Sequence, residues 1–283
     1  MKLISYRYEG QNSVGVLTAA GDAVHPIPGF SDMTALIAAW DTLDKARLTE
    51  AASLPIDSVE VLAPIPHPAQ DVICLGINYF DHAAESGTVT GKSDNVPKNP
   101  IYFSKRVNEC VAPGGCIASH SDIVADLDYE AELAVVLGRD VYGVSRAEAL
   151  DAVFGYTILN DVSARTIQRT HQQWYRGKSL DGFTPLGPCI VTKDAFDVTQ
   201  PKRIQCFVNG ELRQDSTIDM LIFDTAYCIS ELSQGMTLRA GTIISTGTPS
   251  GVGMGFDPPK WLRPGDVVTC SIEGIGDLTN PVR

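Results

Sequence analysis

The feature that most restricts the fold of this chain is residues 128–137, where acidic residues lead into an unbroken apolar run. The second half consists of alanine, valine and leucine and ends at Gly138, which predicts a β-strand. Because successive side chains of a strand point to opposite faces, we expect Glu130 and Glu132 to project from the same face. Carboxylates this close repel each other, so burying them requires a cation or a proton between them.

Two interpretations of this acidic pair remain open from these residues alone. The pair can lie on the solvent side of a half-exposed strand, where acidic residues are common. Alternatively, it is half of a site for a hard cation, because carboxylate oxygens suit Mg²⁺, Mn²⁺ or Ca²⁺.

A third carboxylate follows another predicted strand. Asp161 comes directly after the apolar run 154–159, and a strand end holds a ligand rigidly, although aspartate is equally common in turns. Glu130, Glu132 and Asp161 together suit a hard divalent cation better than zinc, which prefers histidine and cysteine. These three residues are therefore the candidate metal ligands.

Composition and charge argue against several classes of protein. With 283 residues, the chain is long enough for one large core or two unequal domains. A formal net charge of −12 argues against a nucleic-acid or anionic-membrane surface. We find neither a signal-peptide-like segment nor a membrane-spanning run. The seven cysteines include no Cys-x-x-Cys pair, which predicts free thiols in a reducing cytoplasm.

The order of predicted elements indicates two domains. Short strands are expected at residues 3–8 and 13–17, followed by a helix from Met33 to Trp40 and a second helical piece near 44–52. The proline-rich segment 63–68 predicts an extended linker, because proline fixes φ and lacks an N–H donor. We therefore predict a small α/β domain over residues 1–66 and a large β-rich domain over residues 67–283.

A histidine and a glutamate are expected to meet on a short helix that ends at Gly87. His82 and Glu85 are at positions i and i+3, which brings their side chains together. Most such pairs are surface contacts, but a carboxylate beside an imidazole also strengthens it as a base that activates water. The polar stretch 88–99 predicts a mobile loop, so the pair can belong to a lid over a site.

Two glycine-containing motifs do not predict a nucleotide site. Gly177-Lys178-Ser179 lacks the phosphate-loop spacing, because the residue five positions before Gly177 is Gln172. The glycine-rich run 246–255 lacks the further features of a dinucleotide fold. It either brings backbone N–H groups to a substrate carboxylate or is a tight turn that needs glycine.

Taken together, the motifs resemble those of the fumarylacetoacetate hydrolase family, in the family's order from about residue 70 to the C-terminus. The motifs are GINYxxHAAE (76–85), DYEAEL (128–133), NDVSAR (160–165), RGKSLDGF (176–183), VNGE (208–211), TGTP (246–249) and IEGIG (272–276). The resemblance implies an α+β, predominantly β fold: a mixed β-sandwich roll, preceded by the variable leading domain of the longer bacterial members. It also implies a homodimer and one Mg²⁺ or Mn²⁺ per chain.

The resemblance implies roles for nine residues of this chain. The expected metal ligands are Glu130, Glu132 and Asp161; His82 and Glu85 match the water-activating pair; Lys178 matches the lysine that stabilises an enolate; and Arg165, Gln168 and Thr248 match positions that line the substrate. The chain departs from the family at Thr166, where an acidic residue is usual. That position is not a ligand.

These residues and the resemblance predict a metal-dependent hydrolase that cleaves a C–C bond in 2,4-diketo acids of the acylpyruvate or fumarylpyruvate type. An oxaloacetate decarboxylase, or an isomerase of the 2-hydroxyhepta-2,4-diene-1,7-dioate type, would use the same metal. A non-enzymatic metal-binding protein is the alternative of a different class, and the His82–Glu85 pair and Lys178 argue against it. We expect a cytoplasmic homodimer that acts on a small keto acid, without a nucleic-acid or membrane partner.

Overall fold

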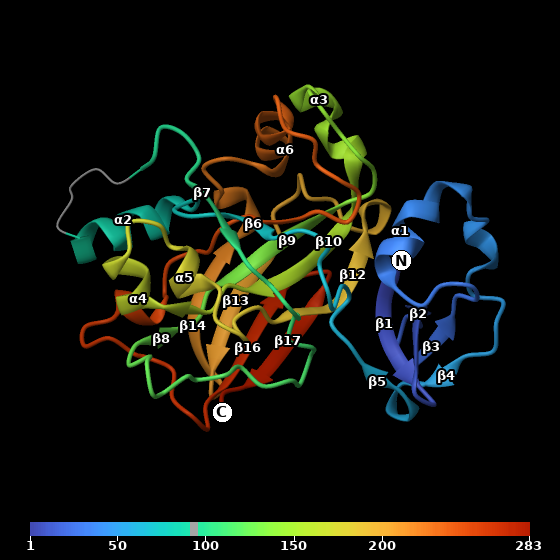
Figure 1. Cartoon of the computed structure of the whole chain (residues 1–283), viewed down its shortest axis with the longest axis horizontal. Coiled ribbons are helices and arrows are strands. Elements are labelled where there is room, and N and C mark those ends of the chain that lie inside the picture. The colour runs from blue at the N-terminus through green and yellow to red at the C-terminus, as the bar shows by residue number, and fades with distance from the viewer. Residues whose placement is uncertain (91–95) are drawn as a thin grey trace.

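The computed structural model of the chain describes residues 1–90 and 96–283, and within these ranges the fold is mostly β (Figure 1). A long mixed sheet is ordered β4-β3-β2-β1-β12-β10-β9-β15-β6-β7, and β5 pairs with β1. Its strands are β1 (Lys2–Tyr8), β2 (Gln11–Leu17), β3 (Ala23–Pro26), β4 (Leu54–Pro55), β5 (Glu60–Val61), β6 (Val72–Leu75), β7 (Tyr102–Lys105), β9 (Ala131–Leu137), β10 (Val153–Asn160), β12 (Leu186–Thr192) and β15 (Ile243–Ser245).

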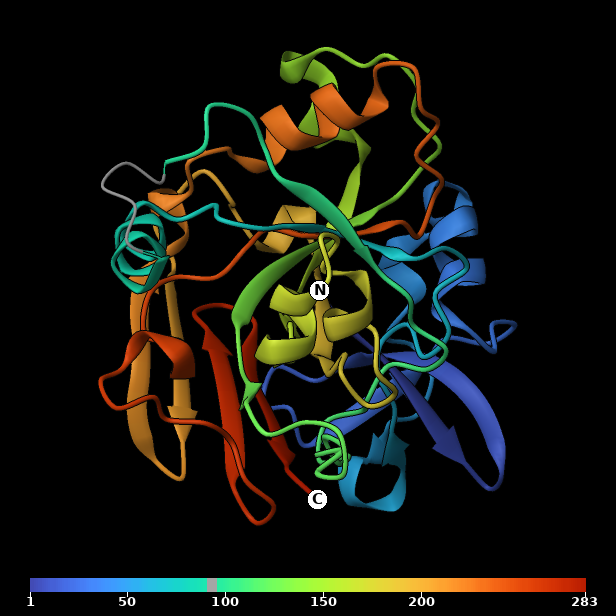
Figure 2. The same ribbon diagram turned by 60° about the vertical axis from the view of Figure 1, so that its left-hand side comes forward.

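A second, antiparallel sheet packs against the middle of the long one, with the order β14-β13-β16-β17. Its strands are β13 (Arg203–Val208), β14 (Glu211–Thr217), β16 (Val267–Ile272) and β17 (Gly276–Pro281), and a small separate pair is formed by β8 (Leu127–Asp128) and β11 (Ser163–Ala164). The helices are α1 (Met33–Ala39), α2 (Phe80–Thr90), α3 (Arg146–Ala149), α4 (Arg165–Thr170), α5 (Tyr175–Lys178) and α6 (Thr225–Ser233). Helices α4 and α5 lie near each other beside the second sheet, and α2 lies at the outer edge (Figure 2).

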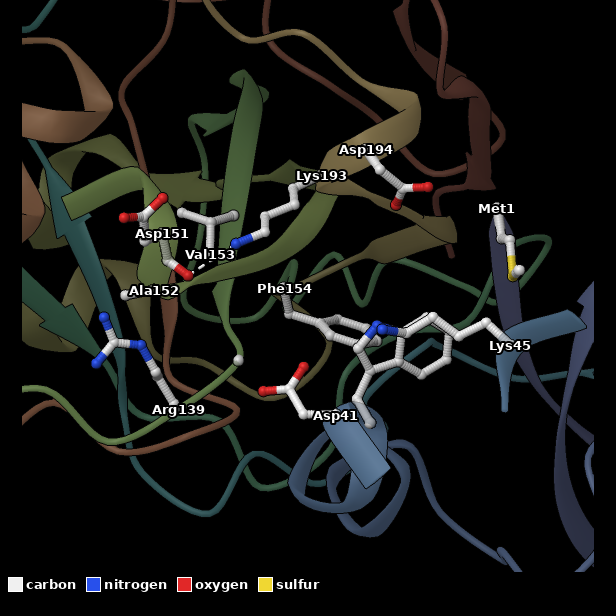
Figure 3. A pocket seen from close by; sticks show the side chains of 12 residues that line it. Met1, Asp41, Lys45, Arg139, Asp151, Ala152, Val153, Phe154, Lys193 and Asp194 are labelled. Carbon is white, nitrogen blue, oxygen red and sulfur yellow. Dashed lines mark hydrogen bonds between the residues drawn. The ribbon is translucent and has the colours of Figure 1, made fainter. Parts of the chain in front are cut away.

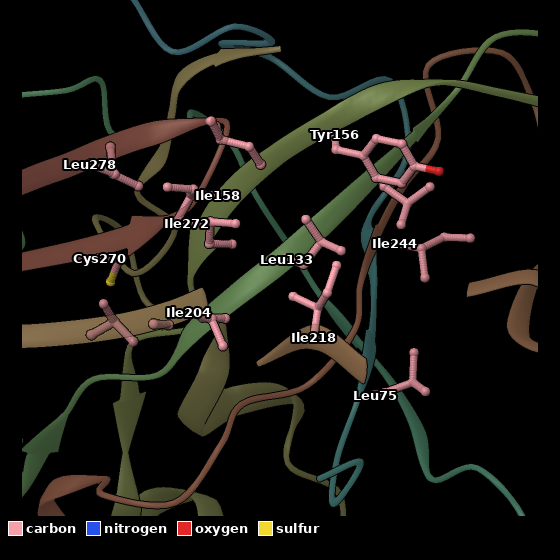
Figure 4. Close-up of a cluster of buried hydrophobic side chains, with 14 of the residues drawn as sticks. Leu75, Leu133, Tyr156, Ile158, Ile204, Ile218, Ile244, Cys270, Ile272 and Leu278 are labelled. Carbon is pink, nitrogen blue, oxygen red and sulfur yellow. The ribbon is translucent and has the colours of Figure 1, made fainter. Parts of the chain in front are cut away.

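The main core lies between the two sheets. Leu133 on β9 and Ile158 on β10 pack with Ile204 on β13 and Ile272 on β16, and all four are buried (Figure 4). The opposite face of β9 is buried as well, because Ala134 belongs to a second apolar cluster. Strand β9 is therefore covered on both faces, which rules out a solvent-facing side for this strand.

The acidic strand is shorter than the sequence predicts. The expected strand 128–137 is interrupted after Asp128, and β9 begins at Ala131. The backbone N–H of Glu130 donates to the side chain of Asn160 at 3.0 Å rather than to a neighbouring strand. At Glu130 a side-chain oxygen thus takes the place of a backbone acceptor on the neighbouring strand. Glu130 and Glu132 therefore do not belong to one regular strand.

The N-terminal residues form the expected strands and first helix but also join the long sheet. Asp32 caps α1 by accepting from the backbone N–H of Ala35 at 2.8 Å. The second helical piece predicted near 44–52 is reduced to a 3-10 turn at Lys45–Arg47, because Leu48 is its one buried residue and a helix needs an apolar face to be stable. Strand β1 pairs with β12, so the sheet crosses the predicted boundary at residue 66.

Helix α2 is longer than predicted. It continues past Gly87 to Thr90, because an isolated glycine weakens a helix without ending it. The mobile loop predicted at 88–99 lies partly in this helix, and residues 91–95 lie outside the described residues. No helix in the described part of the chain is long and apolar enough to cross a lipid bilayer. All seven cysteines lie in this part and are free thiols.

Candidate active site

The three predicted metal ligands meet in the interior of the protein. Glu130, Glu132 and Asp161 are buried, and one carboxylate oxygen from each lies within 4.8 Å of the other two. Glu132 is on β9, Glu130 precedes this strand and Asp161 follows β10. The backbone N–H of Asp161 donates to the carbonyl of Glu130 at 2.9 Å. This bond and the contact of Glu130 with Asn160 fix two of the three ligands relative to each other.

Glu132 forms no ion pair with a described residue, whereas Glu130 and Asp161 do. One oxygen, Oε2, accepts from the Ser245 hydroxyl at 2.5 Å and from the Gly247 N–H at 3.0 Å. The other, Oε1, is buried without a hydrogen-bond partner among the described residues. Burial, and then the charges of Asp161 and Glu130, raise the pKa of Glu132 well above its usual value. A divalent cation held by the three carboxylates would satisfy this oxygen and remove the repulsion, so the donor set fits Mg²⁺ or Mn²⁺.

Three buried cations surround the remaining carboxylate oxygens. Lys178 Nζ lies 2.6 Å from Glu130 Oε2 and 2.8 Å from Asp161 Oδ2, while Lys105 Nζ lies 2.5 Å from Asp161 Oδ1. Burial alone would raise the pKa of Glu130, but the charges of Arg165 and Lys178 outweigh it and lower that pKa. These contacts keep Glu130 ionised and available as a ligand.

Lys105 was not singled out from the sequence. It ends β7, a position where a lysine usually reaches solvent, yet it is fully buried. The sequence offers no local signal for it, because Asp161 lies 56 residues further along the chain. Its Nζ also donates to the backbone carbonyl of Val162 at 3.2 Å, so Lys105 fixes both Asp161 and the chain that follows.

Arg165 connects the metal ligands to a fourth carboxylate. Its Nε donates to Asp128 Oδ2 at 2.8 Å. Its Nη2 lies 2.7 Å from Glu130 Oε1 as an ion pair, although the N–H direction does not meet hydrogen-bond geometry. Four buried carboxylates, those of Asp128 and the three ligands, thus face three buried cations. When all seven groups are ionised, the cluster has one net negative charge. A bound divalent cation would change this to one net positive charge, which favours an anionic ligand.

The predicted acid–base pair forms as expected. His82 Nδ1 lies 3.0 Å from Glu85 Oε2 on α2, and His82 is buried. Glu85 Oε1 also accepts from the backbone N–H of Gly251 at 2.8 Å, which fixes α2 against the glycine-rich loop. A Cβ atom at Gly255 would lie 2.0 Å from Glu85 Oε1, so a side chain there would displace the Glu85 carboxylate. The pair is therefore held in a defined position.

The glycine-rich loop 246–255 serves the protein's own carboxylates. Its backbone N–H groups at Gly247 and Gly251 donate to Glu132 and Glu85, and those at Gly253 and Met254 donate to Asp128. The interpretation that these N–H groups bind a substrate carboxylate is wrong for these four. The sequence could not show this, because the three carboxylates are distant from the loop along the chain.

A cavity of about 320 Å³ is lined by His82 of the pair and by Glu130 of the predicted metal ligands, while Glu85, Glu132 and Asp161 are not part of its lining. Its polar lining includes six predicted site residues: His82, Glu130, Arg165, Gln168, Lys178 and Thr248. The apolar lining includes Leu75, Ile77, Phe103, Trp174 and Met254. The Thr248 hydroxyl already donates to the carbonyl of Ala131 at 3.0 Å and accepts from Gln214, and Gln168 Oε1 accepts from Arg165 Nη1 at 3.2 Å. The predicted substrate residues therefore line the cavity, and the polar groups of Thr248 and Gln168 already form hydrogen bonds within the protein.

Another cavity, of about 370 Å³, lies between the N-terminal residues and β10 and contains none of the predicted site residues (Figure 3). Trp40 and Phe154 both line it and pack against each other edge to face, with their ring centroids 5.1 Å apart. Charged side chains of both signs point into it, among them Asp41, Lys45 and Asp151, and these residues are exposed to solvent. Because solvent-exposed charges of both signs favour no particular kind of ligand, the cavity lined by His82 and Glu130 is the candidate active site.

The chain is similar in sequence to known proteins. Residues 71–283 match the sequence profile described as the fumarylacetoacetate (FAA) hydrolase C-terminal domain. Oxaloacetate tautomerase YisK of Bacillus subtilis is 44% identical over 227 residues, covering 80% of this chain and 74% of that protein.

Two solved structures are similar over the whole chain. A fumarylacetoacetate hydrolase from Exiguobacterium antarcticum is 39% identical, with a TM-score of 0.87 over 100% of this chain and 99% of that one. A maleylpyruvate hydrolase from Sphingobium sp. SYK-6, in complex with manganese(II) and pyruvate, is 27% identical, with a TM-score of 0.78 over 100% and 98% of the two chains. The profile match, the relatives and the buried carboxylate site show that this chain belongs to the fumarylacetoacetate hydrolase family.

Proposed function

We propose that this protein is a divalent-metal enzyme that interconverts the keto and enol forms of a 2-oxo acid, with oxaloacetate as the favoured substrate. The observation that carries the proposal is the buried carboxylate cluster, whose one unpaired oxygen on Glu132 calls for a cation. This cluster adjoins a cavity that also contains a buried histidine. When bound, Mg²⁺ or Mn²⁺ would polarise the 2-oxo group and offset the charge that develops on its oxygen.

The residues of the chain supply binding and proton transfer. Arg165 and Lys178 place positive charge at the end of the cavity where Glu130 lies, and this charge favours a substrate carboxylate and an enolate oxygen. His82, oriented by Glu85, removes a proton from C3 of the keto acid, and a proton is returned to the 2-oxo oxygen to give the enol. The apolar wall around Trp174 excludes water, which protects the enolate.

Hydrolysis of an acylpyruvate is the second candidate, and the His82–Glu85 pair specifically favours it. In this reaction His82 takes a proton from water, and the water oxygen bonds to the 4-carbonyl carbon. The C3–C4 bond then breaks, its electron pair leaves with the pyruvate enolate, and protonation at C3 gives pyruvate and a carboxylic acid. Both candidates need an enolate stabilised at the same place. They differ in whether His82 deprotonates C3 of the substrate or a water molecule, and in that only hydrolysis breaks the C3–C4 bond.

The test compares wild type with His82→Ala on oxaloacetate and acetylpyruvate in the presence of Mn²⁺. Keto–enol exchange is followed by ultraviolet absorbance, and pyruvate release reports decarboxylation or C–C cleavage. We expect exchange by wild type to fall by at least about 100-fold in His82→Ala and to stop in excess chelator. Acetylpyruvate cleavage that depends on His82 would favour hydrolysis instead. Wild-type protein that turns over neither substrate would refute both candidates.

We also propose, from the family resemblance alone, that the protein is a cytoplasmic homodimer. Light scattering of the purified chain at micromolar concentration tests its oligomeric state. A mass of one chain, 30.4 kDa, would contradict the dimer.

A further inference from the structure

One cation that lines the active-site cavity has not been assigned a role. Arg169 lies on α4, and 57% of its side chain is exposed. The other two cations of the lining, Arg165 and Lys178, are buried and paired with carboxylates at 2.6–2.8 Å. Arg169 is therefore at the open side of a cavity whose inner end contains the buried ion pairs of Arg165 and Lys178.

The guanidinium of Arg169 is only weakly engaged by the rest of the protein. Its contact in the described part of the chain is with Asp126, whose Oδ2 lies 3.7 Å from Nη2, beyond hydrogen-bond distance. That same oxygen accepts from the Thr166 hydroxyl at 2.5 Å. Asp126 Oδ1 has no hydrogen-bond partner among the described residues, so neither oxygen of Asp126 forms a hydrogen bond with Arg169. The planar donor groups of Arg169 are therefore available to a carboxylate that enters the cavity.

The helix sets the spacing between the two arginines. Arg165 and Arg169 are one turn apart on α4, so their side chains leave the same face, displaced by about 6 Å along the helix axis. Gln168 lies between them along this face and lines the same cavity. A ligand with one carboxylate near Arg165 and another near Arg169 must therefore be short and must carry its charges at both ends.

We propose that Arg169 binds the distal carboxylate of a dicarboxylic 2-oxo acid and thereby selects diacids over monoacids. This inference rests on the proposed function, because it places the 2-oxo end of the substrate near Arg165 and Lys178. The distal carboxylate gains a bidentate partner at the open side of the cavity, and a neutral group at that end gains nothing from Arg169. The residue is thus a determinant of specificity that takes no part in proton transfer.

The kinetic test uses two substrates that differ only at the distal end, oxaloacetate and its 4-ethyl ester. Arg169→Gln should raise KM for oxaloacetate by about 10- to 100-fold, the usual effect of losing a charge-assisted hydrogen bond, and leave KM for the ester unchanged. Arg169→Lys should recover part of the loss. The control is Arg203→Gln, since the Arg203 side chain is also 57% exposed and ion-paired but lies on β13, outside the lining of the cavity.

A binding test keeps the inference separate from turnover. With Mn²⁺-loaded protein, calorimetry compares oxalate, which has only the metal-binding end, with 3,3-difluorooxaloacetate, which has both carboxylates and cannot enolise. Weaker binding of the difluoro compound alone in Arg169→Gln supports the inference. Equal effects on both ligands, or on both substrates, overturn it while the proposed function stands. Wild-type protein that neither binds the two ligands nor turns over oxaloacetate overturns both.

Discussion

Replacing Glu132 by glutamine separates the requirement for a cation from the stability of the fold. In the metal-free protein, burial and repulsion from the carboxylates of Asp161 and Glu130 raise the pKa of Glu132. A carboxyl group with a raised folded-state pKa contributes stability below its unfolded-state pKa, near 4.5, and this contribution is lost as pH rises through the folded-state value. Glutamine carries no charge at any pH. Metal-free Glu132→Gln should therefore be at least as stable as wild type at pH 8, with a flatter dependence on pH.

The same substitution should abolish stabilisation by metal. Mn²⁺ at 100 times its Kd stabilises wild type by about 2.7 kcal/mol, or about 5 °C in Tm for a chain of this size. Loss of one of three carboxylate ligands should weaken binding by at least about 100-fold. At the same Mn²⁺ concentration the stabilisation then falls to about 0.4 kcal/mol, less than about 1 °C.

Thermal unfolding of wild type and Glu132→Gln, with chelator or Mn²⁺ and from pH 5 to pH 8, measures both effects. The glutamine oxygen can still accept from Ser245 and Gly247, so the hydrogen bonds of this position are retained. Glu50→Gln is the matched control, because Glu50 is exposed on the surface beside Arg47. A metal-free Tm several degrees below wild type at pH 8, or an undiminished rise with Mn²⁺, would refute the reasoning.

Three further predictions concern the surroundings of the site. Gly255→Ala places a Cβ against Glu85, and kcat should fall by about 100-fold because the acid–base pair is displaced; unchanged kinetics would contradict the close approach. Lys105→Met leaves Asp161 with one cation fewer in the interior and should destabilise metal-free protein by about 3 kcal/mol in urea unfolding, with partial recovery in Mn²⁺; equal midpoints would argue against a charged Lys105. Leu133→Ala should cost about 2–5 kcal/mol by the same assay, and a loss below about 1 kcal/mol would show that the core between the sheets rearranges.

Much of the candidate site could be predicted because its residues carry local signals. Glu130 and Glu132 interrupt the start of an apolar strand, and Asp161 ends another. His82 and Glu85 are one helical turn apart, so their contact depends on α2 alone. These patterns are short in the sequence, and each restricts its own geometry. The resemblance to the family then added Lys178 and Arg165, for which the chain offers no local signal.

Other features depend on contacts between distant segments. A lysine at the end of a strand is ordinarily a surface residue, and Lys105 is buried only because β7 lies beside the loop that carries Asp161. The glycine-rich loop has backbone N–H groups whose acceptors, such as Asp128, are more than a hundred residues earlier. Both faces of β9 are covered because the second sheet lies against one face, and the other face belongs to an apolar cluster that includes residues of α1.

Local patterns in the chain indicated the chemistry of the site, namely carboxylates suited to a hard cation and a histidine with its carboxylate. The packing of distant segments settles which charges are buried together, and hence that Glu132 Oε1 has no hydrogen-bond partner among the described residues while Glu130 is paired with two cations. The physical reason is that a pattern of neighbouring residues fixes local direction, whereas burial and electrostatic balance arise from segments that meet only after the sheets have packed.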